Sequence, residues 1–344
     1  MNNCIIIAST PLHLFDAVII AKQFKNFHYH LFYIDQNTPM NDYFLALKKW
    51  QNSPFASVKI FTADKSTLLN KIISKRHEID QIYEQSLQLN PQRIIVGNDR
   101  KNENSALISK MKNDVEFEYM DDGLHSYIVE KSSLIKYTIF DNLLKSLIYG
   151  TKIYTPKHIG TSQYINAAYL YKPDLRHQYL KNTKIHALDI NILQTQDVKE
   201  WVGLIMASAN INLEDELSTL QNILFLPHPK ELSTSKLNSL MELLKHKKRV
   251  AVKLHPRDHE NAKKFSDIGI KIINPKLSAE LIFLSVPADV KIFGFASTSL
   301  LMAAWLRPVL KAFSVKFENG PLDEIETIME QNRIQVVPID QIKF

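Results

Sequence analysis

Short apolar segments alternate with longer segments of helical period along the first part of the chain. Because apolar and aromatic residues dominate runs of strand length, we predict five strands in this part. They cover residues 4–8, 29–34, 57–61, 93–97 and 115–120. Helices are predicted at residues 11–21, 43–50 and 66–87. Strands that alternate with helices are typical of a parallel sheet with helices on both faces.

The same alternation returns after a polar middle segment that lacks a sustained period. Strands are predicted in this second part at residues 222–226, 249–254, 268–273, 290–293, 308–313 and 334–337. Helices are predicted at residues 235–245, 258–265, 277–284 and 322–331, and a further helix is predicted where residues 297–299 follow the strand at 290–293. We therefore predict an α/β protein with two Rossmann-like parallel-sheet domains. The predicted boundaries are an N-terminal domain at residues 1–165, a linker or irregular segment at 166–215 and a C-terminal domain at 216–344.

The composition is that of a globular protein and excludes several functional classes. Hydrophobic residues make up 45% of the chain and charged residues 23%, which excludes wholesale disorder. The formal net charge of +6 fits an anionic ligand. Aromatic and basic residues form no shared stripe, so no nucleic-acid partner is expected. Cys4 is the only cysteine, which excludes an internal disulfide and a multi-cysteine zinc site.

The hydrophobic pattern contains no segment typical of a transmembrane helix. The longest uncharged stretch, residues 292–306, is shorter than the roughly 20 apolar residues that a spanning helix needs. The start of the chain lacks the basic region of a signal peptide, so we expect a cytoplasmic protein. The basic run at residues 245–249 fits either a solvated helix end or an acidic lipid surface, which leaves peripheral contact with the inner membrane open.

Polar residues follow several predicted strands, and ligands of open α/β sheets bind beyond the carboxyl ends of the strands. Asp121 and Asp122 come after residues 115–120 and precede Gly123, which fits a general base or a solvated turn. Two adjacent carboxylates would raise the pKa of one of them. Ser9 and Thr10 follow the first strand, where they fit a helix cap or a ligand contact.

The second half carries polar strand ends of the same kind. Lys253 and His255 lie on one face of a predicted strand end, and His228 belongs to a second His-Pro element. Hydroxyl residues follow Gly294 and enter a helix, as either an N-cap or a set of donors for an anion; they are Ser297, Thr298 and Ser299. The sequence has no glycine-rich phosphate loop and no metal-ligand spacing, so we expect no metal and no cofactor.

The ordered set of strand-end motifs resembles that of bacterial sialyltransferases and polysialyltransferases of the GT-B fold. The motifs are Asp121-Asp122-Gly123, then Lys253-Leu254-His255-Pro256, then Ser297-Thr298-Ser299. The resemblance extends from residue 9 to about residue 301 and includes Gly97-Asn98-Asp99. It implies two Rossmann-like domains with an interdomain cleft, and a CMP-activated sugar as donor substrate.

The resemblance also implies a role for each motif residue. Asp122 would be the general base, with Asp121 as the fallback. His255 would be the general acid or would stabilise the departing phosphate of the nucleotide. The hydroxyl residues 297–299 would hold that phosphate. Lys253 would lie near the cytosine and Glu280 at the ribose hydroxyls. The CMP-sugar-binding residues implied or expected are Ser9, Thr10, His228, Lys253, Glu280, Gly294, Ser297, Thr298 and Ser299.

The activity implied is an inverting, metal-independent transfer of a nonulosonic acid, such as sialic, pseudaminic or legionaminic acid. The acceptor would be a hydroxyl of a bacterial surface glycan, in a capsule or lipooligosaccharide, or of a lipid-linked oligosaccharide. Two alternatives stay open. One is another GT-B transferase that uses CMP-Kdo or a UDP-sugar. The other is a non-catalytic GT-B-like scaffold of a polysaccharide complex, which would bind a nucleotide without turnover.

Overall fold

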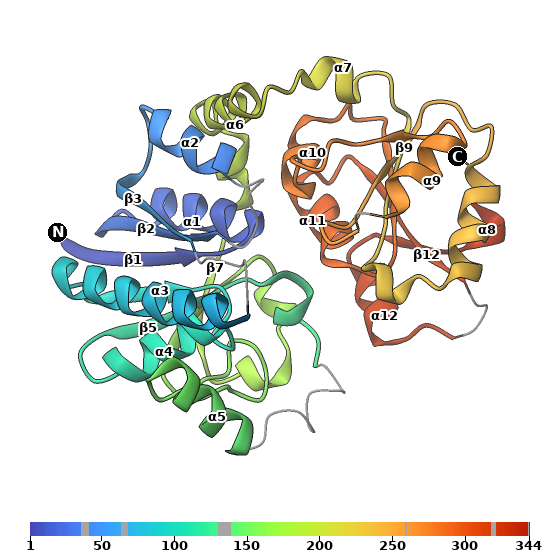
Figure 1. The fold of residues 1–344 in the computed structure, drawn as a ribbon. Helices are drawn as coiled ribbons and strands as arrows, with labels where there is room; N and C mark the ends of the chain where they lie inside the picture. The colour runs from blue at the N-terminus through green and yellow to red at the C-terminus, as the bar shows by residue number, and fades with distance from the viewer. Residues whose placement is uncertain (36–40, 63–67, 130–138, 259, 318–320, 343) are drawn as a thin grey trace. The chain divides into compact units, whose positions relative to one another are not determined.

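The chain folds into two compact α/β units. The computed structural model describes residues 1–35, 41–62, 68–129, 139–258, 260–317, 321–342 and 344. The units are Met1–Ile205 and Met206–Phe344, and each is built around one parallel sheet (Figure 1). The prediction of two parallel-sheet α/β domains is therefore confirmed.

The first unit has a seven-stranded sheet in the order β3-β2-β1-β4-β5-β6-β7. Its strands are β1 (Asn2–Ala8), β2 (Phe27–Asp35), β3 (Phe55–Thr62), β4 (Arg93–Val96), β5 (Glu116–Met120), β6 (Ile165–Leu170) and β7 (Lys184–Ala187). Its helices are α1 (Pro11–Gln23), α2 (Asn41–Lys49), α3 (Leu68–Leu89), α4 (Asn102–Met111), α5 (Ile139–Tyr149) and α6 (Gln196–Ala209). Figure 1 shows α1, α2 and α6 on one face of the sheet and α3, α4 and α5 on the other. Alternate side chains of β1 point to opposite faces of the sheet. Ile5 and Ile7 lie on one of these faces and pack with Leu107 of α4.

The segment 166–215 is not the irregular linker that its polar composition suggested. Nearly all of β6, the whole of β7 and α6 lie in it, and residues up to Ile205 belong to the first unit. β7 is an edge strand of four residues with only partly buried or exposed side chains, so it carries no apolar run. Trp201 of α6 is buried, with its ring centroid 5.0 Å from that of Phe15 and 5.5 Å from that of Trp50. These contacts anchor α6 on the first unit.

The second unit has a six-stranded sheet in the order β10-β9-β8-β11-β12-β13. Its strands are β8 (Asn222–Phe225), β9 (Val250–Lys253), β10 (Lys271–Ile272), β11 (Lys291–Gly294), β12 (Lys311–Lys316) and β13 (Gln335–Pro338). Its helices are α7 (Leu213–Leu217), α8 (Thr234–Leu244), α9 (Asn261–Asp267), α10 (Ala279–Ser285), α11 (Thr298–Leu306) and α12 (Glu324–Gln331). Leu240 of α8 and Phe265 of α9 pack on Val252 in the main core of this unit.

Both sheets reverse their winding direction at the first strand of the unit. In the first unit β1 lies between β2 and β4, and in the second unit β8 lies between β9 and β11. In open α/β sheets, ligands bind outside the carboxyl ends of the strands at this switch point. The strand order therefore singles out the segments that follow β1 and β4 and those that follow β8 and β11.

The uncharged stretch 292–306 is internal to the second unit. It contains most of β11 and the whole of α11, whose residues Leu300, Leu301 and Met302 are fully buried. Among the helices in the described part of the chain, none has the length and apolar character that crossing a bilayer requires.

Candidate active site

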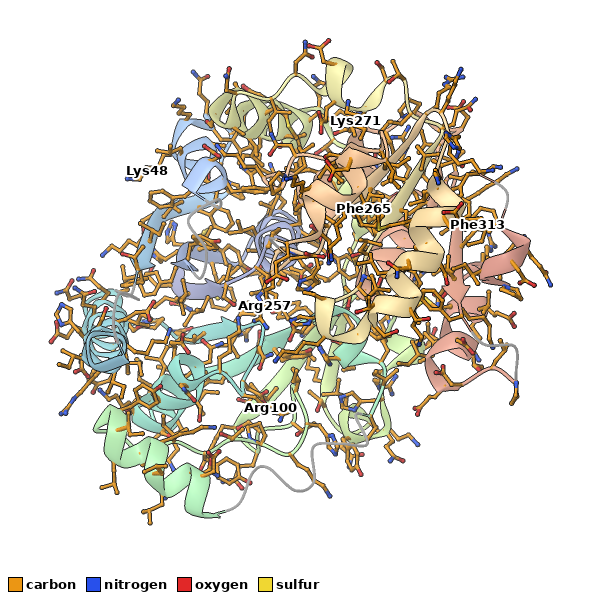
Figure 2. The ribbon with its side chains drawn as sticks, turned by 45° about the vertical axis from the view of Figure 1, so that its right-hand side comes forward. Lys48, Arg100, Arg257, Phe265, Lys271 and Phe313 are labelled. Atoms are coloured by element: carbon orange, nitrogen blue, oxygen red, sulfur yellow. The ribbon has the colours of Figure 1, made fainter. Side chains whose placement is uncertain are left out.

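A cluster of polar side chains surrounds Asp122 at the switch point of the first unit. Asp122 follows β5, and its side chain is 15% exposed. Its Oδ1 atom lies 3.0 Å from Nε2 of His13, in the first turn of α1. Its Oδ2 atom accepts a hydrogen bond of 2.7 Å from Nδ2 of Asn98, which follows β4. Arg100, labelled in Figure 2, comes two residues after Asn98. The carboxylate is thus held from the ends of three strands.

A chain of hydrogen bonds fixes the tautomer of His13. Lys101 donates from Nζ to Oγ of Ser9 over 2.6 Å, and Oγ of Ser9 lies 3.3 Å from Nδ1 of His13. Because an ammonium can only donate, the hydroxyl hydrogen of Ser9 is available to Nδ1 of His13. The neutral imidazole then carries its hydrogen on Nε2 and donates it to Asp122.

His13 is fully buried, although it lies in the first turn of α1. Its ring lies against the backbone of Gly97, where an added Cβ atom would come within 2.3 Å of Nε2. No real Cβ contact is that short, so the ring can occupy this position only because residue 97 is glycine. His13 is buried because α1 begins at the switch point and directs its first turn toward the end of the sheet.

Asp121 has a different environment from its neighbour. It is fully buried, and its two carboxylate oxygens accept four hydrogen bonds. The donors are the backbone N–H groups of Gly123 and Tyr171, at 2.8 and 3.1 Å, and the hydroxyls of Ser126, at 2.9 Å, and Tyr127. Asp121 therefore braces the turn after β5 and presents no lone pair to a ligand.

The pKa values of the two aspartates do not follow the like-charge argument. Burial raises the pKa of Asp121 to about 7, against the hydrogen bonds that it accepts. Burial also acts to raise the pKa of Asp122, but the hydrogen bond from His13 and the positive charge of neighbouring basic side chains outweigh it, so that this pKa is lowered. The expectation that an adjacent carboxylate raises the pKa of the base is wrong for Asp122, which stays ionised at neutral pH.

Two histidines meet beside the switch point of the second unit. His228 follows β8, His255 follows β9, and their ring centroids are 4.9 Å apart with an interplanar angle of 61°. Nδ1 of His228 accepts from the backbone N–H of Lys230 over 3.2 Å, and Nδ1 of His255 accepts from that of Arg257 over 3.1 Å. Each neutral ring therefore carries its hydrogen on Nε2. Burial first, and then the proximity of His228 and the charge of Arg257, lower the pKa of His255.

Lys253 and Glu280 are buried ionisable side chains of the same unit, each 6% exposed. Nζ of Lys253 donates to the carbonyl oxygen of Pro275 over 3.3 Å. Burial lowers the pKa of Lys253 to about 8, although the charges of Glu216 and Glu280 act in the opposite direction. Burial raises the pKa of Glu280.

The hydroxyl residues 297–299 are half-buried at the start of α11, which follows β11. Ser297 is the N-cap residue, yet its side chain makes no capping hydrogen bond. This leaves a helix N-terminus without the side-chain acceptor that serves α10, where Ser278 accepts from the N–H of Leu281. A Cβ atom on Gly294 would lie 3.2 Å from Cγ of Leu300, so glycine lets α11 pack closely on β11.

The family model for alpha-2,8-polysialyltransferases (POLYST) matches residues 4–316, which is nearly the whole chain. The chain belongs to the alpha-2,8-polysialyltransferase family. It is accordingly a glycosyltransferase of the sialyltransferase type, and its two Rossmann-like units are those of the GT-B fold.

Solved structures agree on the fold of this polysialyltransferase-family chain. It is similar to an alpha/beta-galactoside alpha-2,3-sialyltransferase from Photobacterium phosphoreum, with a TM-score of 0.60 and 14% identity over 100% of both chains. It also resembles the UDP-GlcNAc 2-epimerase of Neisseria meningitidis, with a TM-score of 0.52 and 12% identity over 98% of this chain and 87% of the other. No curated protein sequence matches the chain at a significant level.

The site of the polysialyltransferase-family chain includes residues to which the sequence assigned no role, although Asn98 belongs to the Gly97-Asn98-Asp99 motif. His13, Asn98 and Lys101 position Asp122 through the hydrogen bonds described above. The sequence could have pointed to them, because they lie in the segments that follow β1 and β4. The hydroxyls of Ser9 and Thr10 already have partners within the protein, since Oγ1 of Thr10 caps α1 by accepting from the N–H of His13. No group of three or more histidine, cysteine or carboxylate side chains is arranged to hold a metal ion in the described ranges.

Proposed function

We propose that the protein transfers a nonulosonic acid, of the sialic acid type, from its CMP-activated form to a hydroxyl of a bacterial surface glycan. The proposal rests on membership of the alpha-2,8-polysialyltransferase family and on the environment of Asp122. Asp122 has an ionised, partly exposed carboxylate at a switch point, which is the state that a general base needs before it accepts a proton. This is the observation that carries the proposal.

The reaction forms one bond and breaks another at the anomeric carbon of the donor. The acceptor oxygen bonds to that carbon while the bond between the carbon and the phosphate oxygen breaks, and CMP departs. Asp122 takes the proton of the acceptor hydroxyl. Attack from the side opposite the phosphate inverts the configuration. We assign the base role to Asp122 alone, since the oxygens of Asp121 are all engaged.

The second unit supplies groups that suit a single departing phosphate. His255 presents an N–H from Nε2, and the start of α11 presents backbone N–H groups and hydroxyls. Donors of this kind stabilise negative charge that develops on a leaving group without a Lewis acid. Lys253 and Glu280 are then available for the cytosine and the ribose. On this basis we propose that the transfer proceeds without a divalent metal.

A nucleotide panel in EDTA tests the donor class. Thermal unfolding is followed with CMP, CDP, UMP, UDP, GDP and ATP, because a ligand that binds only the folded state raises the melting temperature. We expect a shift with CMP and then transfer from a CMP-nonulosonic acid in EDTA. A shift with UDP and none with CMP would replace the donor by a UDP-sugar, the kind of ligand that is bound in the similar structure of a UDP-GlcNAc 2-epimerase. CMP binding with no turnover from any CMP-sugar, including CMP-Kdo, would favour the scaffold.

A further inference from the structure

The strand order gives His228 a central position that the sequence does not reveal. β8, which leads to His228, lies between β9, which leads to His255, and β11, which leads to Ser297. The two outer strand ends carry the groups proposed for the phosphate of CMP. The switch point itself lies between β8 and β11, where ligands of such sheets bind. His228 therefore stands between the two groups already proposed to contact the phosphate.

The local structure around His228 repeats that around His255. In each case a strand ends at a His-Pro turn, and Nδ1 accepts the backbone N–H of the residue two positions later, Lys230 or Arg257. Both rings are half-buried. Neither Nε2 atom has a hydrogen-bond partner among the described residues. Two N–H donors with the same tautomer thus occur on rings whose centroids are 4.9 Å apart.

Two adjacent imidazole donors are a poor site for a cation and a good one for an anion. In each ring the lone pair of Nδ1 accepts a backbone N–H, and Nε2 carries the hydrogen. Neither ring therefore offers a nitrogen lone pair to a metal ion. Negative oxygens can accept from both Nε2–H groups, and such charge-assisted bonds are stronger than neutral ones. Ser297–Ser299, on the other neighbouring strand end, add donors for the remaining oxygens.

We propose that His228 is a second phosphate-binding residue, which acts with His255 as a pair of N–H donors to the nucleotide phosphate. This inference rests on the proposed function and names a further residue of the same site. It gives the departing phosphate two imidazole donors in place of one. It also explains why two His-Pro turns of the same geometry occur at adjacent strand ends.

The experiment measures the affinity of CMP and of cytidine by calorimetry for the full chain and for His228→Asn. Asparagine can accept the N–H of Lys230 through its side-chain oxygen, so the turn is kept, but it places no donor at the position of Nε2. We expect CMP to bind about 10- to 100-fold more weakly, which is the range for a lost hydrogen bond to a charged group. Cytidine affinity should stay unchanged, because cytidine has no phosphate.

Two further variants keep the outcome unambiguous. His228→Gln carries an amide N–H near the position of Nε2, and we expect it to recover most of the CMP affinity. Lys230→Met removes a neighbouring exposed charge but keeps the backbone N–H, and we expect at most a few-fold effect. Melting temperatures identify any variant that fails to fold. If His228→Asn does not fold, the CMP affinity of His228→Gln decides whether an N–H donor at this position is needed.

The failures of the two proposals are distinguishable. An unchanged ratio of CMP to cytidine affinity in His228→Asn would overturn the role of His228 while the CMP proposal stands. If the unsubstituted chain binds UDP and not CMP, the proposed donor is wrong, and the same comparison with UDP and uridine tests the histidine pair. If it binds no nucleotide, both proposals fall.

Discussion

At the scale of single residues, Asp121 and Asp122 differ in what their carboxylate oxygens contact. Asp121 accepts four hydrogen bonds in a fully buried position, whereas Asp122 has one contact to each oxygen and remains partly exposed. A buried carboxylate whose partners all donate cannot be replaced by an amide without placing donors against donors. We therefore expect substitutions at these two neighbouring positions to affect different properties, stability at Asp121 and turnover at Asp122.

Exchange of each aspartate for asparagine should separate these roles. We expect Asp121→Asn to lower the free energy of unfolding by about 3 kcal/mol, since a buried hydrogen-bond network loses its acceptor. Asp122→Asn should change it by less than about 1 kcal/mol and reduce turnover about 10²- to 10⁴-fold, as expected for loss of a general base. Urea unfolding and initial rates measure the two effects. Turnover near that of the unsubstituted protein in Asp122→Asn would contradict the base assignment.

The lowered pKa of Lys253 predicts a pH dependence of nucleotide binding. With a pKa of about 8, the ammonium is charged at pH 7 and loses its proton as the pH rises through 8. A neutral amine is a weaker donor to the cytosine, so we expect CMP affinity to fall between pH 7 and pH 9. Lys253→Met should bind CMP more weakly at pH 7 and show a flatter profile. Calorimetry between pH 7 and pH 9 measures the CMP affinity of both proteins. An equal decrease of CMP affinity with pH in the two proteins would contradict the role of Lys253.

At the scale of secondary-structure elements, two helix starts of the second unit differ in whether the N-cap side chain makes a hydrogen bond. Ser233 begins α8 and accepts a hydrogen bond from the N–H of Lys236 over 3.3 Å. Ser297 begins α11 with the same extended backbone but makes no capping hydrogen bond. An N-terminus without a side-chain cap keeps backbone donors available for an anion. The two serines are a matched pair for separating these effects.

Removal of each serine hydroxyl should have opposite consequences. We expect Ser233→Ala to lower the free energy of unfolding by about 1 kcal/mol, which is typical for the loss of an N-cap, and to leave CMP affinity unchanged. Ser297→Ala should leave stability nearly unchanged and weaken CMP binding several-fold. Thermal unfolding and calorimetry check both statements. A loss of stability in Ser297→Ala without an effect on CMP would assign Ser297 to capping.

At the scale of the whole molecule, the proposed base and the proposed nucleotide site belong to different units. Asp122 and its supporting residues lie in Met1–Ile205, and His255, Lys253 and the start of α11 lie in Met206–Phe344. Each unit has its own sheet and its own core, so a local change in one unit need not alter the other. Binding and turnover should therefore be separable by substitution.

Gly97→Ala tests this separation. The added methyl would come within 2.3 Å of the His13 ring and must displace it, so we expect turnover to fall at least 10-fold while CMP affinity stays unchanged. Gly203→Ala is the control, because nothing lies within 4 Å of the added methyl and alanine favours the exposed helix position. Rates and calorimetry measure the two effects. A parallel loss of CMP affinity in Gly97→Ala would show that the first unit also shapes the nucleotide site.

The periodicity of the sequence was sufficient to predict most strands and helices, and with them two α/β units. It did not predict β6 and β7, nor the helices α4, α5, α6 and α7. For β7 the reason is that a short edge strand lacks the apolar run of a central one. The polar strand ends could also be found from the sequence, because parallel strands bring their carboxyl ends to one edge of a sheet. The ordered motifs then led to the family that the whole-chain match confirms.

Local sequence alone determined most of the elements, the presence of two α/β units and the candidate residues at the strand ends. Tertiary structure alone decided which candidates meet. His13 and Asp122 are 109 positions apart, and Asn98 and Asp122 are 24 apart, so their contacts depend on strand order. Strand order likewise places His228 beside His255, and the burial of Asp121 distinguishes it from Asp122. Caps and periods are short-range effects, whereas strand pairing, burial and hydrogen-bond partners arise only when distant segments pack together.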